Sequence, residues 1–322
     1  MRLGSNYFLK GTGNMSKTVF LFSGQGSQYV GMGKELCEAY PQVDVYKRAS
    51  EILGFDLAAK INDSTEEELA QTVIAQPAIM ATSLTAFEIM KANGVEFSAV
   101  AGHSLGEYAA MVASGILSFE DGFRVIKARA EAMQKAAENS SGAMYAIMGK
   151  DAEEIEKVCA EIDGYVVPVN YNSAAQTVIA GETAAAEAAA AKFTELGAKA
   201  VKLGVSSAFH SKLMQPAAEE FEAALKSMNI TFNKPAAAFY SNLTGGEQTD
   251  FGNMPEKLAK HIVSPVKFTS ELNALQAAGY ENFVELGPNK VLTGLVKKTL
   301  KGVNAVNVEN IKTLEKALDL FK

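Results

Sequence analysis

The chain has 322 residues, of which 48% are hydrophobic and 21% charged, and its formal net charge is −7. This length exceeds the size at which a single hydrophobic core stops growing, so the sequence predicts one large domain and a smaller one. The negative charge argues against nucleic acid as the main partner, because phosphate binding requires a basic surface. Cys37 and Cys159 show no pairing or ligand pattern, which indicates a reducing compartment and no structural metal.

The N-terminal segment is predicted to lie outside the fold. Residues 1–14 lack the apolar stretch of a signal peptide, and Met15 precedes a run that is typical of a first strand. We therefore interpret residues 1–14 as a leader. No uninterrupted apolar run reaches the roughly 18 residues that a membrane helix needs. The expectation is a cytoplasmic protein with no membrane partner.

Short apolar runs predict the core of the large domain. Thr18–Phe22 is continuous and is closed by Ser23-Gly24, which is typical of a strand buried on both faces. Ala99–Ala101 is a second short apolar run, which ends at Gly102, and Phe283–Leu286 before Gly287-Pro288 is typical of a late core strand. Helical patterns alternate with these strands, so the sequence predicts an α/β fold with a mainly parallel sheet.

Residues 141–205 show a separate pattern of predicted strands and helices. The predicted order is strand, helix, two strands paired around Asn172-Ser173, an alanine-rich helix, and a last strand. The expected strands span residues 142–148, 165–170, 177–180 and 198–203, and the expected helices span 151–162 and 183–196. This βαββαβ order matches a ferredoxin-like unit. We interpret it as a small domain inserted into a large domain that comprises residues 15–140 and 206–322.

A G-x-S-x-G motif marks the candidate nucleophile. Gly102-His103-Ser104-Leu105-Gly106 follows a short apolar strand and precedes a helical pattern that stops at Gly115. A serine at such a sharp strand-to-helix turn is the nucleophile of α/β-hydrolase-like enzymes, and we predict that architecture for the large domain. The helix N-terminus offers free N–H groups to a developing oxyanion. The alternative is a glycine-rich turn with an incidental serine.

The general base can be argued by elimination. A serine nucleophile needs a nearby base, usually a histidine, and the chain has 3 histidines: His103, His210 and His261. Successive residues of a sharp turn point in divergent directions, which disfavours His103 as the partner of Ser104. His210 lies where the chain re-enters the large domain and is the first candidate, with His261 second.

Arg129 is the candidate anion-binding residue. It lies beside the apolar stripe of a predicted helix, three residues after Ile126 and four before Met133. A guanidinium held near an apolar surface needs an anionic partner. Beside a serine nucleophile, it could bind the carboxylate of a substrate. An internal salt bridge or a snorkelling side chain is the structural alternative.

A glycine loop follows the first strand. Gly24-Gln25-Gly26-Ser27-Gln28 begins like a dinucleotide-binding loop, but the G-x-G-x-x-G pattern needs glycine where Tyr29 stands. The loop could instead supply a backbone N–H group to an active site.

With these residues in view, the chain resembles the bacterial malonyl-CoA:acyl carrier protein transacylases over essentially all of residues 15–322. The motifs that carry the resemblance recur in order: Gly24-Gln25-Gly26-Ser27-Gln28, Gln76-Pro77-Ala78, the GHSLGEY block at 102–108, Arg129 with Met133-Gln134, Asn170-Tyr171-Asn172-Ser173, His210 with Leu213-Met214, Ser264-Pro265-Val266, and Glu285-Leu286-Gly287-Pro288 before Lys290-Val291-Leu292.

The resemblance implies roles for individual residues. Ser104 would carry the acyl group, His210 would be the base, and Arg129 would form a bidentate pair with the malonyl carboxylate. The backbone N–H groups of Gln25 and Leu105 would form the oxyanion hole.

Three further positions follow from the resemblance. Phe209 stands where malonyl-selective acyltransferases carry phenylalanine. The family commonly has glutamine where this chain has His261, and the backbone carbonyl at that position orients the catalytic histidine, so His261 is expected to support His210. Ser23 replaces a proline of the family motif without loss of a chemical group.

The reaction implied is ping-pong transfer of malonyl from malonyl-CoA to the phosphopantetheine thiol of acyl carrier protein, in fatty acid biosynthesis. The expected enzyme is a monomer without a metal or redox cofactor. A free-standing acyltransferase serving a polyketide synthase is an alternative that shares these motifs. A thioesterase or lipase is disfavoured, because those enzymes place histidine late, after an acidic residue. A catalytically silent carrier-protein-binding module is disfavoured by the intact set Ser104, His210 and Arg129.

Overall fold

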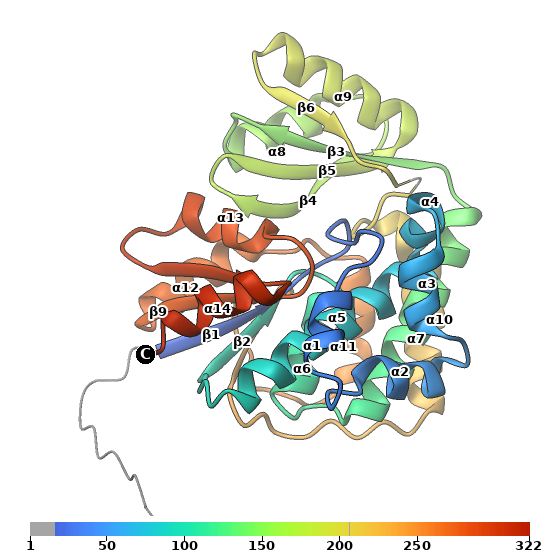
Figure 1. The fold of residues 1–322 in the computed structure, drawn as a ribbon. Helices are drawn as coiled ribbons and strands as arrows, with labels where there is room; N and C mark the ends of the chain where they lie inside the picture. The colour runs from blue at the N-terminus through green and yellow to red at the C-terminus, as the bar shows by residue number, and fades with distance from the viewer. Residues whose placement is uncertain (1–16, 206) are drawn as a thin grey trace, which may run out of the picture.

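A computed structural model describes residues 17–205 and 207–322 of the chain (Figure 1). The leader predicted at residues 1–14 lies outside the described residues. Within them, the strands form a six-stranded sheet and a separate four-stranded sheet. The predicted α/β class with a mainly parallel sheet is confirmed, because β10, β9, β1, β2 and β7 pair in parallel and β8 pairs antiparallel to β7.

The six-stranded sheet has the order β10-β9-β1-β2-β7-β8. Its strands are β1 (Lys17–Phe22), β2 (Ala99–Gly102), β7 (Ala238–Ser241), β8 (Gly246–Glu247), β9 (Tyr280–Leu286) and β10 (Asn304–Val308). The first strand lies in the middle, so the loops after β1 and β2 emerge side by side at the carboxyl edge of the sheet.

Both faces of this sheet are buried. On β1, Phe20 and Phe22 join one hydrophobic cluster, whereas Val19 and Leu21 join another. Successive side chains of a strand point to opposite faces, so the continuous apolar run predicted from sequence covers both. The first cluster packs on α5 (Thr72–Ala92), α6 (Gly106–Ala113) and α7 (Phe119–Glu138), and the second on α12 (Phe268–Ala277) and α13 (Val291–Thr299).

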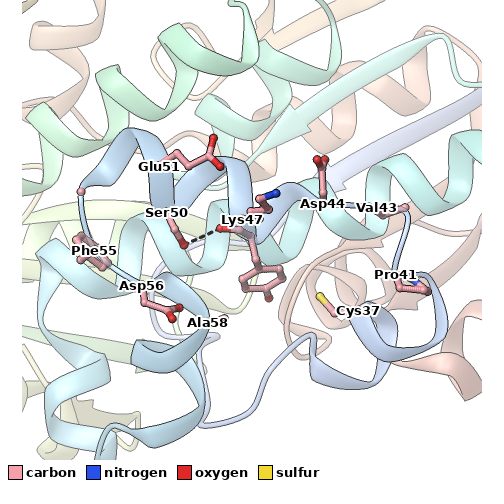
Figure 2. A pocket seen from close by; sticks show the side chains of 12 residues that line it. Cys37, Pro41, Val43, Asp44, Lys47, Ser50, Glu51, Phe55, Asp56 and Ala58 are labelled. Carbon is pink, nitrogen blue, oxygen red and sulfur yellow. Dashed lines mark hydrogen bonds between the residues drawn. The ribbon is translucent and has the colours of Figure 1, made fainter.

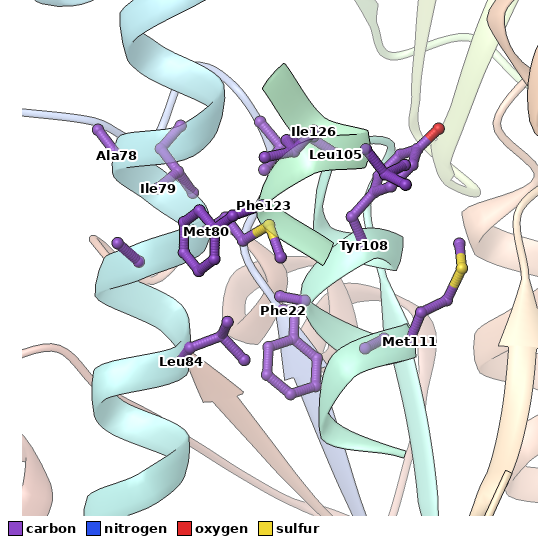
Figure 3. Packing of buried hydrophobic residues seen from close by; sticks show 14 of the residues in the cluster. Phe22, Ala78, Ile79, Met80, Leu84, Leu105, Tyr108, Met111, Phe123 and Ile126 are labelled. Carbon is purple, nitrogen blue, oxygen red and sulfur yellow. The ribbon is translucent and has the colours of Figure 1, made fainter. Parts of the chain in front are cut away.

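Aromatic and methionine side chains fill the first hydrophobic cluster. Phe22 lies between Leu84 of α5 and Met111 of α6, and Met80 lies next to Phe123 of α7 (Figure 3). Burying one such side chain contributes roughly 1.5–3 kcal/mol. This packing fixes the strand-to-helix connection between β2 and α6 against the rest of the core.

Further helices contribute buried side chains to the same cluster. They are α1 (Lys34–Ala39), α2 (Val45–Leu53), α3 (Leu57–Asp63), α4 (Glu66–Ala70), α10 (Gln215–Ser227), α11 (Met254–Ile262) and α14 (Ile311–Asp319), with a 3₁₀ turn at Lys212–Met214.

Helix α5 has the length and composition of a membrane span. It has 21 residues with a mean hydropathy of 1.4 in its most apolar window, and 83% of that window is buried inside the protein. It is not an uninterrupted apolar run, because polar residues such as Gln76 and Thr82 lie within it. Its burial identifies it as a core helix.

The four-stranded sheet is antiparallel with the order β4-β5-β3-β6. Its elements are β3 (Gly142–Met148), α8 (Ala152–Glu161), β4 (Val166–Ser173), β5 (Gln176–Glu182), α9 (Thr183–Glu195) and β6 (Lys199–Lys202). The turn between β4 and β5 lies at residues 174–175, not at Asn172-Ser173 as the sequence suggested. Ser173 still pairs with Gln176, so the strand continues through it.

One face of the four-stranded sheet points toward the six-stranded sheet. Ala143 and Ile147 pack under α8 and α9, whereas Met144 and Ala146 join the main core. The two helices therefore cover the outer face only, as Figure 1 shows at the top of the molecule.

The strand β4 attaches this sheet to the rest of the chain. The Tyr171 N–H donates to the Val266 carbonyl at 2.9 Å, and the Val266 N–H donates to the Val169 carbonyl at 2.8 Å. The Thr269 hydroxyl adds a bond to the Tyr171 carbonyl at 2.9 Å. The small sheet is thus held above the carboxyl ends of β1 and β2.

Candidate active site

Ser104 lies at a tight turn between β2 and α6. Its φ is +53°, a left-handed conformation that a serine rarely adopts. The turn needs glycine on both sides. A Cβ at Gly102 would lie 2.1 Å from the backbone of Gly106, and a Cβ at Gly106 would lie 2.1 Å from the Phe22 carbonyl oxygen. The strand-turn-helix context predicted from G-x-S-x-G is therefore present.

Gly106→Ala should destabilise the protein by about 1–3 kcal/mol, because the new methyl group meets backbone that cannot move aside. The matched control is Gly294→Ala on α13, where a Cβ meets no atom of the described residues within 4 Å. That change should be neutral or stabilising by up to about 1 kcal/mol, since alanine is the better helix former. Urea unfolding measures both. Equal effects of the two changes would contradict the close packing of the turn.

His210 is in contact with the serine. The Ser104 Oγ lies 2.7 Å from His210 Nε2, and His210 Nδ1 lies 3.0 Å from the carbonyl oxygen of His261. A carbonyl only accepts, so Nδ1 carries the proton and Nε2 is left to accept from the serine hydroxyl. Burial, and next the charge of Arg129, lower the pKa of His210 to about 3. The imidazole is therefore neutral at pH 7, the form that a general base requires.

Arg129 reaches the same serine from α7. Its Nη2 donates to Ser104 Oγ at 3.0 Å, and its guanidinium lies 5.2 Å from the centre of the Tyr108 ring. The side chain is fully buried, and its Nε and Nη1 have no hydrogen-bond partner among the described residues. The internal salt bridge considered from sequence is not found within residues 17–205 and 207–322. A buried cation with two unused donors is a preformed site for an anion.

The two predicted oxyanion donors are Gln25, which lines the cleft beside Ser104, and Leu105, which directly follows the serine. Within the part of the chain that the structure describes, no acceptor is bound by the backbone N–H of Gln25 or of Leu105. The Gln25 side chain donates to the Thr72 hydroxyl at 3.4 Å and accepts from Gln76 at 3.2 Å. These bonds fix the loop after β1 while its backbone donor stays available.

The cleft has a volume of about 560 Å³ and runs between the two sheets. Ser104 and His210 lie in its wall with Phe209, Met133 and Met144, so its reactive end has an apolar side. Phe209 therefore lies where it could contact an acyl chain. His261 does not line this cleft. Its ring is buried, with Nδ1 3.1 Å from a Glu107 carboxyl oxygen.

Two side-chain contacts at the nucleophile were not anticipated. The Asn242 side-chain oxygen accepts the Ser104 N–H at 2.7 Å, and the His103 ring meets Asn172 Oδ1 of the small sheet at 2.8 Å. Asn172 lay in a motif noted from sequence, but without a role. Asn242 directly follows β7, a short strand that the sequence analysis did not predict.

A second cavity of about 770 Å³ lies among α1, α2 and α3 (Figure 2). Burial raises the pKa of its half-buried Cys37 to about 11, so the thiol stays protonated. Ser50 in its wall donates to the Tyr46 carbonyl at 2.7 Å and accepts from the Leu57 N–H at 3.0 Å, and no base contacts it among residues 17–205 and 207–322. This cavity therefore offers no activated nucleophile.

No cluster of three or more metal-ligating His, Cys, Asp or Glu side chains occurs in the described ranges 17–205 and 207–322.

Comparison with known proteins agrees with this geometry. The profile of the acyl transferase domain matches residues 19–319. The chain is 41% identical to the malonyl CoA-acyl carrier protein transacylase of Bacillus subtilis strain 168, over 96% of this chain and 98% of that protein. It is 38% identical to the transacylase of that name from Escherichia coli K12, over 95% and 100%.

Solved structures show the same likeness. The malonyl CoA-acyl carrier protein transacylase of Clostridium perfringens superposes with a TM-score of 0.90 at 38% identity, covering 95% of this chain and 97% of that one. A malonyl-transacylase in complex with its type II polyketide acyl-carrier protein also superposes with a TM-score of 0.90, at 36% identity over 95% and 100%. The chain thus belongs to the malonyl CoA-acyl carrier protein transacylase family.

Proposed function

We propose that this enzyme transfers malonyl from malonyl-CoA to the phosphopantetheine thiol of acyl carrier protein in fatty acid biosynthesis, through an ester on Ser104. One observation carries the proposal. The Ser104 Oγ lies 2.7 Å from a neutral imidazole nitrogen and 3.0 Å from a buried guanidinium with two unused donors. A nucleophile with its base and an anion site within one hydrogen bond suits an acyl group that carries a carboxylate.

In the first half-reaction, His210 Nε2 takes the hydroxyl proton of Ser104 as Oγ attacks the thioester carbonyl. The carbonyl oxygen becomes negative, and the N–H groups of Gln25 and Leu105 are the donors that would stabilise it. The carbon–sulfur bond then breaks, and the departing sulfur of coenzyme A takes the proton from His210. Malonyl remains on Ser104 as an ester.

Arg129 gives the carboxylate of malonyl two charge-assisted hydrogen bonds. It also links substrate binding to the strength of the base. The charge of Arg129 helps to hold the pKa of His210 low. A carboxylate bound to Arg129 offsets that charge, so the pKa of His210 rises and the histidine becomes a stronger base when malonyl is present.

In the second half-reaction, the carrier-protein thiol loses its proton to His210 and attacks the ester. The carbon–oxygen bond breaks, and the proton returns to Ser104. Neither half-reaction requires a metal or a redox cofactor, so we propose none. One chain supplies every group named here, in line with a monomer. The free thiols Cys37 and Cys159 suit the reducing cytoplasm.

We also propose the finer fold assignment. The strand-turn-helix at Ser104 supports an α/β-hydrolase-like large domain of residues 15–140 and 206–322. Numbered in chain order, the strands of the small sheet lie in the order 4-1-3-2, which supports a ferredoxin-like domain of residues 141–205.

The alternatives are less well supported. In a hydrolase triad an acidic side chain orients the histidine, but here a backbone carbonyl bonds to His210 Nδ1. Service to a polyketide carrier protein is stated for one structural neighbour at 36% identity, and the curated relatives at 41% and 38% are not named for it.

Intact-mass measurement tests the proposal directly. After exposure to malonyl-CoA, the chain should gain the mass of one malonyl group, and it should gain less with acetyl-CoA or methylmalonyl-CoA. Addition of carrier protein bearing phosphopantetheine should move that mass to the carrier. A chain that gains no acyl mass, or that prefers acetyl, contradicts the proposal.

Removing the base should slow both half-reactions. His210→Ala should lower kcat/KM for malonyl transfer at least ~100-fold, the lower end for general base catalysis. His261→Gln is the control, because its proposed contribution is a backbone carbonyl that glutamine also has. It should keep activity within about tenfold, which corresponds to ~1.4 kcal/mol. Reversed magnitudes would make His261 the base.

A further inference from the structure

Asn242 reaches the nucleophile from a neighbouring strand. Strands β2 and β7 are parallel neighbours, with Ala99 opposite Ala238 and Val100 opposite Phe239. The carboxyl ends of parallel strands meet at one edge of a sheet. Asn242 follows the last residue of β7 and therefore lies beside the turn that carries Ser104, although 138 residues separate the two in the chain.

The side chain of Asn242 connects the two ends of that turn. Its Oδ1 accepts the Ser104 N–H at 2.7 Å, and its Nδ2 donates to the Gly102 carbonyl at 2.7 Å. Ser104 has the left-handed φ of +53°, and such a conformation persists only where the surroundings hold it. Asn242 also occupies the N–H of Ser104, so the next donor, that of Leu105, is the one left open.

Two buried carboxyl groups hold Asn242 in turn. Its backbone N–H donates to Glu107 Oε1 at 2.5 Å, and its Nδ2 donates to Glu271 Oε1 at 2.6 Å. All three residues are buried. The amide could not be reversed, since its NH₂ would then meet the Ser104 N–H and its oxygen would meet the Gly102 carbonyl oxygen. Asn242 therefore has one orientation, which is the one that accepts from Ser104.

The carboxyls fit this role in their neutral forms. Burial raises the pKa of Glu107 to about 8 and that of Glu271 well above its usual range. Neutral carboxyls avoid placing two negative charges under the nucleophile. The Glu107 contact with His261 is weaker, because the ring nitrogen at 3.1 Å makes no aligned hydrogen bond. The strong bonds of this cluster thus converge on Asn242.

We propose that Asn242 is a positioning residue of the transfer reaction: it holds the backbone of Ser104 so that Oγ meets His210 Nε2. This inference takes the substrate of the reaction from the proposed function, whereas the role of Asn242 rests on the hydrogen bonds alone. It assigns to Asn242 an effect on the reactivity of Ser104, and none on the binding of the malonyl carboxylate by Arg129.

The test compares Asn242→Leu, which removes the acceptor, with Asn242→Asp, which keeps an oxygen facing Ser104. A buried Asp at this position should be protonated, since it would lie against the Gly102 carbonyl and Glu271. For the leucine variant, we expect kcat of Ser104 acylation to fall about 10- to 100-fold, as for a buried donor left unpaired. KM for malonyl-CoA and the malonyl-to-acetyl ratio should stay near wild type. Asn242→Asp should recover most of kcat.

Thr82→Val is the matched control for stability. Thr82 is a fully buried polar residue whose hydroxyl bonds to Tyr46 at 2.5 Å and to the Ala78 carbonyl at 2.9 Å, and it does not line the cleft of Ser104. It should lower Tm without changing kcat. If Asn242→Leu also lowers Tm but leaves kcat per folded molecule unchanged, Asn242 is structural only and the inference is wrong. Should the leucine variant not fold, Asn242→Ala replaces it under the same criteria.

A second measurement separates this inference from the proposed function. A fluorophosphonate reacts with an activated serine whatever its natural acyl group: an oxygen–phosphorus bond forms, fluoride leaves, and His210 takes the proton. Its rate should fall with Asn242→Leu by the same factor as acylation. A wild-type enzyme that reacts with the fluorophosphonate but takes no malonyl would refute the proposed function alone. Equal fluorophosphonate rates in wild type and Asn242→Leu would refute the inference alone.

Discussion

Ser104→Ala should abolish the malonyl adduct and leave the melting temperature near that of the wild type. The substitution removes one hydroxyl and adds no bulk. His210 Nε2 and Arg129 Nη2 both contact that hydroxyl, and His210 lines a cleft that water can enter. No nearby group replaces the lost nucleophile, so the loss should be complete within the sensitivity of intact-mass measurement.

The control for this result is another serine of the same region. Ser114 directly follows α6, and its hydroxyl donates to the Ala110 carbonyl at 2.8 Å. Ser114→Ala removes a buried hydroxyl without touching the cleft and should still gain one malonyl group. If Ser104→Ala retained a malonyl mass, the nucleophile would be a different residue.

Arg129→Ala should change which acyl group the enzyme accepts. Malonyl differs from acetyl by one carboxylate, and the cleft must remove that charge from water to bind it. Breaking a buried ion pair typically costs ~3–5 kcal/mol, because the surviving charge is uncompensated. The mild end of that range corresponds to a loss of roughly two to three orders of magnitude in kcat/KM for malonyl. Acetyl transfer should stay unchanged or rise.

The measurement is the malonyl-to-acetyl ratio of kcat/KM in variants with near wild-type Tm. Arg129→Lys should recover little of the ratio, because an ammonium cannot form the planar bidentate pair. Arg124→Ala on the same helix is the control, since Arg124 is half-exposed and pairs with Asp121 at 2.9 Å. It should leave both activities as they are. An unchanged ratio in Arg129→Ala would remove the carboxylate-binding role.

Local signals were enough to predict the elements that carry the nucleophile. Residues 18–22 and 99–101 are continuous apolar runs, and Phe283–Leu286 precedes Gly287-Pro288; the structure has β1, β2 and β9 at these positions. The turn at Ser104 depends on glycines within two residues of it, so its geometry was also visible in the sequence. The same holds for the small sheet, whose strands and helices are neighbours in the chain.

Long-range pairing was not visible in the same way. β7 has only 4 residues, and it becomes recognisable as a strand by its position next to β2. The contact of Asn242 with Ser104 results from the pairing of β7 with β2. No spacing of residues in the sequence predicts that pairing.

The placement of His210 was predictable only in part, because it combines a local sequence signal with a long-range contact. Elimination among three histidines selected it, and the structure places it 2.7 Å from the serine. The carbonyl expected to orient it, at His261, lies 3.0 Å from Nδ1. The catalytic roles of these residues stay predictions for the experiments above.

The chain from His261 to Thr269 has a consequence for protein engineering. Its first carbonyl bonds to His210, and its later residues bond to β4 through Val266 and Thr269. The segment 261–269 therefore supports both the small sheet and the base His210, although residues 141–205 look like a separable insert. A chimaera that takes the small sheet from a relative should take the segment 261–269 from the same parent. Otherwise a small displacement of the grafted sheet would move the segment 261–269 and, with it, the imidazole of His210. The hybrid would then fold but react slowly.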